Sequence, residues 1–152
     1  MEKLAIKKKV LAAGIKTQQA IIEDFRSRID ELKATGQQYA SEQQDSGAQS
    51  MTEDTEEQAS LMTEQLNMLL EEMDKLSRIE TDNVHESVHL GSIVQTKDQR
   101  FFVSVSLERF KCDGVDYFGI STKAPIYKAM EGKRKGEGFE VNGRHFEILD
   151  LY

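Results

Sequence analysis

The first half of the chain has the hydrophobic spacing of two amphipathic helices that pack against each other. Seam positions recur at alternating steps of four and three residues, which is a heptad pattern. They are Leu11, Ile15, Gln18, Ile22, Phe25, Ile29 and Leu32 in the first run and Ala59, Met62, Leu66, Leu69, Met73 and Leu76 in the second. Two seams of similar length predict an antiparallel coiled-coil hairpin over residues 1–82.

The segment between the two seams has the composition of a turn. Residues 37–50 continue neither apolar stripe, and Gly36 and Gly47 weaken a helix at either end of it. Ser50 is followed three residues later by Glu53, the spacing of a capping box. We therefore expect the turn within residues 37–50 and the start of the second helix at Ser50.

Residues 83–152 change to the period-two alternation of β-strands. Strand-like runs rich in aromatic and β-branched residues lie at 88–96, 101–107 and 115–121. Asn142-Gly143 separates two further runs and predicts a tight hairpin. A short helix is expected from Pro125 to Glu131, ending at Gly132. The pattern predicts an α+β chain with four or five antiparallel strands and one short helix after the hairpin.

Charge is concentrated in the helical half. The net charge is −7, and no Lys or Arg lies between Lys33 and Lys75, an interval that holds ten acidic residues. An acidic surface argues against general or sequence-specific binding to nucleic acid, which rewards clustered cations. In a closed hairpin, the basic residues 7–9 are expected near Glu71, Glu72 and Asp74, where each exposed pair contributes about 0 to 1 kcal/mol.

Few of the remaining residues suggest a membrane or a metal site. No stretch reaches the roughly 18 to 20 apolar residues of a membrane span, and residues 1–16 lack a signal-peptide pattern. Cys112 is the single cysteine, and its spacing from the histidines His85, His89 and His145 is not that of a zinc site. We expect a cytoplasmic protein with no intrinsic cofactor or metal.

The segment APIYKAMEGKRKGEGFEV, residues 124–141, resembles the C-terminal domain of the bacterial Gre transcript-cleavage factors. In that pattern SPI or SPL is followed by xxALxGKxxGDxVxV. The matching positions here are Pro125, Ile126, Ala129, Met130, Gly132, Lys133, Gly136, Glu137, Phe139 and Val141. GSIVQT, residues 91–96, is similar to the opening strand of that domain.

This resemblance implies a fold and a partner. It divides the chain into a coiled-coil hairpin, residues 1–82, and a small FKBP-like β domain, residues 83–152. The domain docks on RNA polymerase at the rim of its secondary channel, and the acidic hairpin tip enters the channel to help hold a catalytic Mg²⁺ of the polymerase. The implied docking residues are Ser121, Thr122, Lys123, Pro125 and Ile126.

The tip departs from the family. Cleavage-competent Gre tips resemble DxxEN followed by an acidic residue and tyrosine, a string that this sequence lacks. Glu42 and Asp45 in the turn are the nearest equivalent, followed by Glu53 and Asp54. A simpler interpretation is that Glu42 and Asp45 belong to a solvated turn and that Glu53 and Asp54 favour the positive end of a helix dipole.

Other functions remain open at this level. A Gre-like chain either stimulates transcript cleavage by the polymerase or occupies its channel without cleavage. An FKBP-like domain can also be a peptidyl-prolyl isomerase, which needs an apolar, aromatic-lined pocket, and a heptad seam can serve a coiled-coil dimer. We favour a monomeric, RNA polymerase-binding elongation regulator that is not itself an enzyme.

Overall fold

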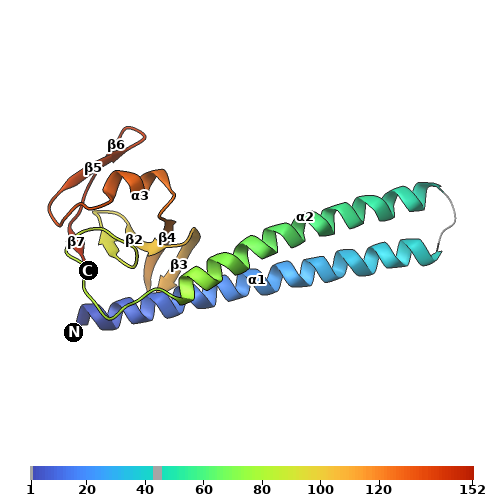
Figure 1. The fold of residues 1–152 in the computed structure, drawn as a ribbon, viewed down its shortest axis with the longest axis horizontal. Coiled ribbons are helices and arrows are strands. Elements are labelled where there is room, and N and C mark those ends of the chain that lie inside the picture. The colour runs from blue at the N-terminus through green and yellow to red at the C-terminus, as the bar shows by residue number, and fades with distance from the viewer. Residues whose placement is uncertain (1, 43–45) are drawn as a thin grey trace. The chain divides into compact units, whose positions relative to one another are not determined.

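The chain is α+β, with two long helices followed by a mostly antiparallel sheet domain (Figure 1). The computed structural model describes residues 2–42 and 46–152, and the side chains of residues 2–36 and 53–152. The chain divides into two compact units, residues 18–71 and residues 1–17 with 72–152, and each is described by itself. The division predicted from the sequence, 1–82 and 83–152, stays a prediction.

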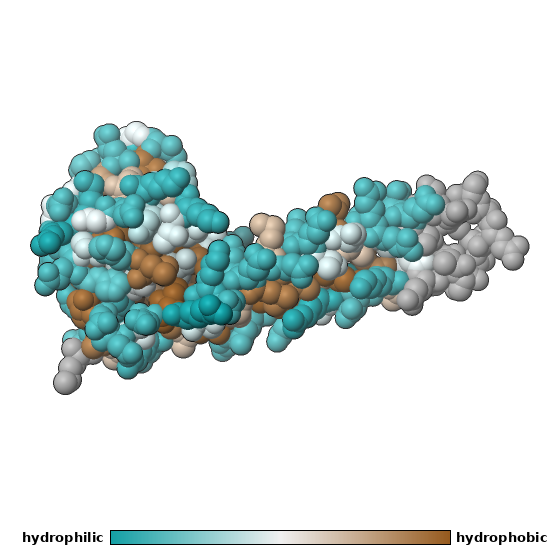
Figure 2. Space-filling view, in the orientation of Figure 1, coloured by the Kyte–Doolittle hydropathy of each residue, from teal (hydrophilic) through white to brown (hydrophobic). Residues whose placement is uncertain are grey.

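Helix α1 spans Glu2–Glu42 and helix α2 spans Ser46–Ser77. Within residues 18–71 they run antiparallel, because Gln18 Nε2 donates to the Leu69 carbonyl at 3.0 Å, and a Cβ at Gly36 would lie 3.5 Å from the Thr55 methyl group. The predicted seam residues are buried or half-buried along both helices. Figure 2 shows hydrophobic residues along the line where the helices meet, so each seam finds its partner in the same chain.

The predicted start of the second helix is wrong, and the predicted turn segment is too long, although the two helices do separate within residues 37–50. α1 continues to Glu42 and α2 already begins at Ser46, so most of residues 37–50 is helical. Ser50 and Glu53 therefore lie inside α2 and do not form a capping box at its start. Helix formation is cooperative, and packing against a partner helix outweighs the roughly 1 kcal/mol cost of a glycine such as Gly36.

The sheet domain contains more strands than predicted. The five-stranded sheet has the order β3-β4-β2-β1-β7, and β5 and β6 form a separate two-stranded sheet. The bounds are β1 Ile93–Gln95, β2 Arg100–Ser104, β3 Leu107–Cys112, β4 Val115–Ser121, β5 Gly138–Val141, β6 Arg144–Glu147 and β7 Asp150–Leu151. Helix α3, Pro125–Met130, lies between β4 and β5.

Local turn signals were the most accurate part of the strand prediction. Asn142 and Gly143 have φ of 52° and 78°, which confirms the tight β5–β6 hairpin. Pro125 begins α3 and Gly132, at φ 74°, follows its end as predicted. The same Asp-Gly signal at Asp113 and Gly114 joins β3 to β4 and was overlooked.

Two predictions about the strands are wrong. The run 101–107 is not one strand, because β2 ends at Ser104 and β3 begins at Leu107. The sheet is not wholly antiparallel, because β2 and β4 pair in parallel. The chain runs from β2 through β3 to β4. This crossover connection is a long-range feature, and the alternation of polar and apolar residues along the chain does not predict it. The strand predicted at 88–96 is also shorter, since β1 covers Ile93–Gln95.

Two hydrophobic cores hold the unit made of residues 1–17 and 72–152. One joins the first turns of α1 and the end of α2 to the sheet through Val10, Leu76, Phe102, Phe110 and Tyr152. The other lies between the sheet and α3, where Tyr127 and Met130 pack with Val94, Phe101 and Ile148. This unit therefore combines residues from the first and the last parts of the sequence. None of the helices in the described residues combines the length and apolar character that a membrane crossing needs.

The expected pairing of residues 7–9 with Glu71, Glu72 and Asp74 is wrong. Lys8 pairs with Asp82 at 3.7 Å, and Lys9 pairs with Asp113 at 3.3 Å. Lys7 is fully buried and donates from Nζ to the Asn83 carbonyl at 2.8 Å. The register in which Gln18 meets Leu69 brings these lysines beyond the end of α2.

Burial lowers the pKa of Lys7 to about 8 from its ordinary value of 10.5. Because the folded value lies below the unfolded one, the unfolded chain binds the proton more tightly and stability rises between these two pH values. The neighbouring titratable group is His85, whose pKa is lowered by burial and by the charge of Lys7. The buried ammonium group of Lys7 therefore destabilises the folded state at neutral pH. This destabilisation disappears in alkali, where Lys7 is uncharged.

We predict that Lys7→Met removes this cost. The unfolding free energy of the wild type, relative to Lys7→Met, should rise by about 2 to 3 kcal/mol from pH 7 to pH 10.5, the size that a shift from 10.5 to about 8 implies. Urea unfolding of both proteins at the two pH values measures it. The exposed Lys8→Met is the control and should show almost no pH-dependent difference. A difference that stays flat for Lys7→Met would contradict the burial of its ammonium group.

Candidate functional site

The acidic residues expected at the hairpin tip are only partly described. Glu53 and Asp54 lie exposed on the surface of α2. Glu42 is the last residue of α1, with its side chain outside the described residues, and Asp45 lies outside them altogether. Because α2 begins at Ser46, Glu53 and Asp54 lie beyond its first turn, and the helix-dipole interpretation of these two residues is wrong.

No group of three or more His, Cys, Asp or Glu side chains in the described part of the chain is arranged to hold a metal ion. Glu53 and Asp54 are neighbours in the sequence, so their side chains point in directions roughly 100° apart around the helix. The acidic face of α2 is therefore a distributed negative surface. A shared Mg²⁺ at the tip remains a prediction.

The predicted docking residues gather in the loop between β4 and α3. Ser121 stabilises this loop twice, because its Oγ accepts from the Lys123 N–H at 3.1 Å and its carbonyl accepts from the Ala124 N–H at 3.0 Å. Thr122, Lys123 and Pro125 are exposed. The loop thus presents a short, internally hydrogen-bonded surface.

The end of this loop is fixed to the core of its unit. Pro125 occupies the first turn of α3, where its missing N–H has no cost. Ile126 is half-buried and packs against the core that contains Tyr127 and Met130. Lys123 makes no ion pair with any residue that the structure describes, so its charge is free to meet a partner. The loop residues are brought together, but whether they bind a partner is still a prediction.

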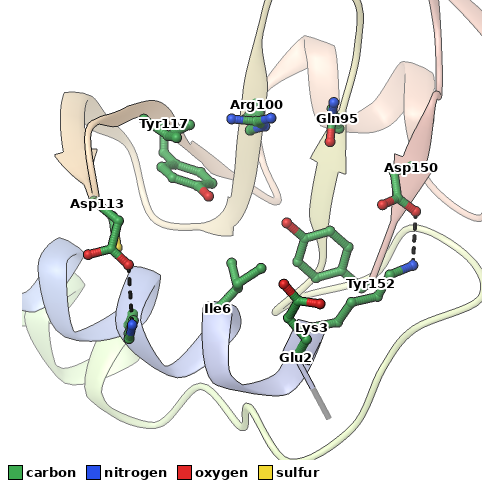
Figure 3. Close-up of a pocket in the computed structure, with 12 residues that line it drawn as sticks. Glu2, Lys3, Ile6, Gln95, Arg100, Asp113, Tyr117, Asp150 and Tyr152 are labelled. Carbon is green, nitrogen blue, oxygen red and sulfur yellow. Dashed lines mark hydrogen bonds and ion pairs between the residues drawn. The ribbon is translucent and has the colours of Figure 1, made fainter.

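A pocket of about 410 Å³ lies between the first turns of α1 and the ends of the sheet strands (Figure 3). Its lining combines α1 residues with residues from β1, β2, β3, β4 and β7. Lys3 Nζ lies 3.0 Å from Asp150 Oδ1, and Lys9 pairs with Asp113 across the opposite side of the pocket. Charged, phenolic and aliphatic side chains therefore line this cavity together.

The buried phenols of the pocket have shifted pKa values. The pKa of Tyr152 is raised to about 12, chiefly by burial and also by the neighbouring Tyr117, while the positive charge of Arg100 opposes the shift. Burial also raises the pKa of Tyr117, again against the charge of Arg100. Both hydroxyls therefore stay protonated at neutral pH and can donate hydrogen bonds.

The pKa of Asp150 is lowered, in contrast to those of the two tyrosines. Burial alone would raise its pKa, but the hydrogen bond from Lys3, the backbone N–H of Leu151 at 2.9 Å and the charges of Lys3 and Lys135 lower it overall. This carboxylate fixes the start of α1 to β7. It is ionised at neutral pH and neutralises Lys3.

Sequence reasoning missed the pocket entirely. Its residues range from Glu2 to Tyr152, and the local β1–β2 and β3–β4 hairpins each supply only part of the lining. Arg100 lies just before one predicted strand and Tyr117 lies within another. Lys3 lies near the start of the first predicted helix, so none of the three positions indicates a site. The pocket arises because the sheet order brings β1, β2 and β4 beside the start of α1, which a local pattern does not report.

No protein-family model and no curated protein matches the sequence. Among solved structures, the chain is similar to the crystal structure of the GreA factor homolog 1 protein of Thermus thermophilus. The two share 22% sequence identity, with coverage of 92% of this chain and 95% of that chain and a TM-score of 0.37.

We predict that Lys3→Gln raises the pKa of Asp150, because burial continues to raise it after the ammonium group is lost. Carboxyl carbon shifts in an NMR titration report the change directly. Since the lowered pKa stabilises the fold above the ordinary value of 3.8, Lys3→Gln should also cost about 0 to 1 kcal/mol at pH 7 and less in acid. Lys135→Gln, at 3.8 Å from the same oxygen, should shift Asp150 less. An unchanged Asp150 titration in Lys3→Gln would contradict the pairing.

Proposed function

We propose that this protein is a transcription elongation regulator that binds RNA polymerase. In this proposal the FKBP-like domain docks at the rim of the polymerase secondary channel and the helical hairpin inserts its acidic end into the channel. The protein acts in the cytoplasm as a monomer, has no catalytic activity of its own and makes no sequence-specific contact with nucleic acid.

One observation carries the proposal most strongly. The Gre-like segment 124–141 forms α3, two glycine turns and β5 in sequence order, with Gly132 and Gly136 at φ of 74° and 90°. Met130 and Phe139 of this segment are buried in the core beneath α3. The positions that resemble the family are thus those on which this fold depends, because few other residues fit a positive φ or a filled core.

The hairpin supports the same proposal by its charge. The described part of α2 carries eight carboxylates from Glu53 to Asp74 and no Lys or Arg before Lys75. Such a surface repels nucleic acid and favours a cationic protein channel. Carboxylate oxygens are also the ligands that Mg²⁺ prefers. Both features fit a hairpin that acts inside a polymerase bearing a catalytic metal.

A second version of the function is supported by a different observation. The DxxEN string of cleavage-competent tips is missing from the sequence, and Glu42 and Asp45 are its nearest equivalents. A hairpin without suitably placed carboxylates occupies the channel and does not assist the metal. Occupancy without stimulated cleavage is therefore the alternative, and the two versions share the docking step.

The β4–α3 loop gives a test of docking. In the family, the two residues just before this proline are an acidic residue and a serine. This chain has Lys123 and Ala124 there. We expect the polymerase surface facing Lys123 to be acidic, so that Lys123→Glu weakens binding at least about tenfold, or 1.4 kcal/mol. Fluorescence anisotropy of the labelled full chain with polymerase from the same organism measures the affinity.

Lys111→Glu is the matched control, because Lys111 is an exposed lysine of the same sheet domain on β3. It carries the same charge reversal and should leave the affinity unchanged. Equal losses in both variants would indicate a general charge effect, and unchanged binding of Lys123→Glu would remove the loop from the docking surface.

The tip carboxylates distinguish the two versions of the function. If Glu42 and Asp45 assist a polymerase Mg²⁺, the double variant Glu42→Ala/Asp45→Ala should lose about a hundredfold or more of stimulated cleavage while binding stays intact. Shortening of the transcript in a backtracked elongation complex is the measurement. Glu53→Ala/Asp54→Ala is the comparison within α2. Cleavage that survives in Glu42→Ala/Asp45→Ala would defeat this assignment, and absence of cleavage in the wild type would favour occupancy.

A further inference from the structure

Among the residues that the structure describes, one cation that lines the pocket in Figure 3 has no carboxylate partner. Two of the three basic side chains that line it are neutralised, Lys3 by Asp150 and Lys9 by Asp113. The third is Arg100, which makes no ion pair with any described residue. A half-buried guanidinium without an anion is an unusual arrangement, because Arg in such a position is ordinarily paired.

We propose that this pocket binds a small organic anion, in which a carboxylate or phosphate group contacts Arg100 and the hydroxyls of Tyr117 and Tyr152. The remainder of the ligand is apolar. This site lies within the unit of residues 1–17 and 72–152, and it goes beyond the binding of polymerase. It holds or fails independently of that function.

The geometry around Arg100 favours an oxyanion. Arg100 begins β2 opposite Gln95 of β1, and its side chain extends into the pocket beside Tyr117 (Figure 3). The phenol groups of Tyr117 and Tyr152 point toward one another across the same space. A planar guanidinium presents parallel donors that match two oxygens of a carboxylate or phosphate, and protonated phenols supply further donors.

The rest of the lining favours an apolar body on that anion. Ile6 and Val115 contribute aliphatic surface, and the two tyrosine rings contribute aromatic surface. The volume of about 410 Å³ lies in the range of small-molecule sites, which is roughly 300 to 1,000 Å³. An inorganic ion would leave most of this space and its apolar surface unused. A compact aromatic or aliphatic acid fits both parts of the lining.

The existing ion pairs select against other ligands. Asp150 and Asp113 are paired with Lys3 and Lys9, so Glu2 is the one carboxylate of the lining that no ion pair among the described residues neutralises. A cationic ligand at Glu2 would leave Arg100 without an anion. A neutral ligand would leave the guanidinium of Arg100 without its ionic partner, which costs more in a half-buried site than in water. An anion satisfies Arg100 and leaves both lysine pairs unchanged.

The chain offers a direct readout, because it contains four tyrosines and no tryptophan. Tyrosine fluorescence of the full chain can be followed during titration with benzoate, phenyl phosphate or neutral benzyl alcohol. We expect one of the two anions to bind with Kd of about 1 mM or tighter, which suits ligands of this size. Benzyl alcohol should bind at least about tenfold more weakly.

The variants isolate the guanidinium. Arg100→Gln should weaken binding of the anion at least about tenfold, whereas Arg100→Lys, which retains the charge, should lie between it and the wild type. Arg26→Gln is the matched control, because Arg26 is exposed on α1 and lies outside the pocket lining. Circular dichroism verifies that each variant is folded before it is titrated, and Tyr117→Phe provides a second, milder change with the ring retained.

Each outcome of the titration either identifies the class of ligand or overturns the proposal. Preference for benzoate identifies a carboxylate ligand, and preference for phenyl phosphate identifies a phosphate monoester. The proposal is overturned if neither anion binds at about 10 mM, far above the expected Kd. It is equally overturned if benzyl alcohol binds as well as the anions, or if folded Arg100→Gln binds like the wild type. Polymerase binding by the same wild-type sample reports separately on the proposed function.

Discussion

Burial of the helix ends against the sheet is the interaction on which the rest of this structure depends. Val10 of α1 and Leu76 of α2 are fully buried with Phe102 of β2, and Tyr152 closes the same core. These contacts join the first residues of the chain to the last, so one cooperative unit contains residues from both halves of the sequence. The buried Lys7 lies in this region, and its desolvation cost at neutral pH is tolerated because the surrounding apolar contacts outweigh it.

The same unit positions both surface features that we connect with function. Its core beneath α3 fixes Ile126 and thereby the β4–α3 loop, whose exposed Lys123 makes no ion pair with any described residue. Its other core holds α1 beside the sheet, and the pocket around Arg100 results from that packing. The proposed docking loop and the proposed ligand pocket therefore belong to one compact unit but depend on different hydrophobic cores. Loss of the core beneath α3 would affect the loop first, and loss of the other core would affect the pocket first.

Sequence patterns predicted those parts of the fold that local spacing determines. The two heptad seams, the Asn142-Gly143 hairpin and the helix that begins at Pro125 could be predicted because each depends on residues a few positions apart. The ends of α1 and α2 could not, because tertiary pairing extends a helix through residues with weak local preference. The parallel pairing of β2 and β4 depends on a crossover, and the lysine contacts at residues 7–9 depend on helix register.

Local spacing also determines which residues of the candidate sites could be predicted to lie together. The residues from Ser121 to Ile126 are contiguous, so their proximity could be predicted, whereas their role in docking stays a prediction. The pocket could not, because Lys3, Arg100, Tyr117 and Asp150 meet only through the sheet order. Glu53 and Asp54 were placed correctly on the second helix, but the wrong helix start gave them the wrong electrostatic role.

The central claim is that this chain binds RNA polymerase, and size-exclusion chromatography of the two purified proteins tests it most directly. The chain should be mixed with polymerase from the same organism, held on a stalled and backtracked transcript, and the eluted fractions assayed for both proteins. Our account predicts that the chain elutes with the polymerase and that less of its Lys123→Glu variant does so. Elution of the wild-type chain entirely apart from the polymerase would contradict the account.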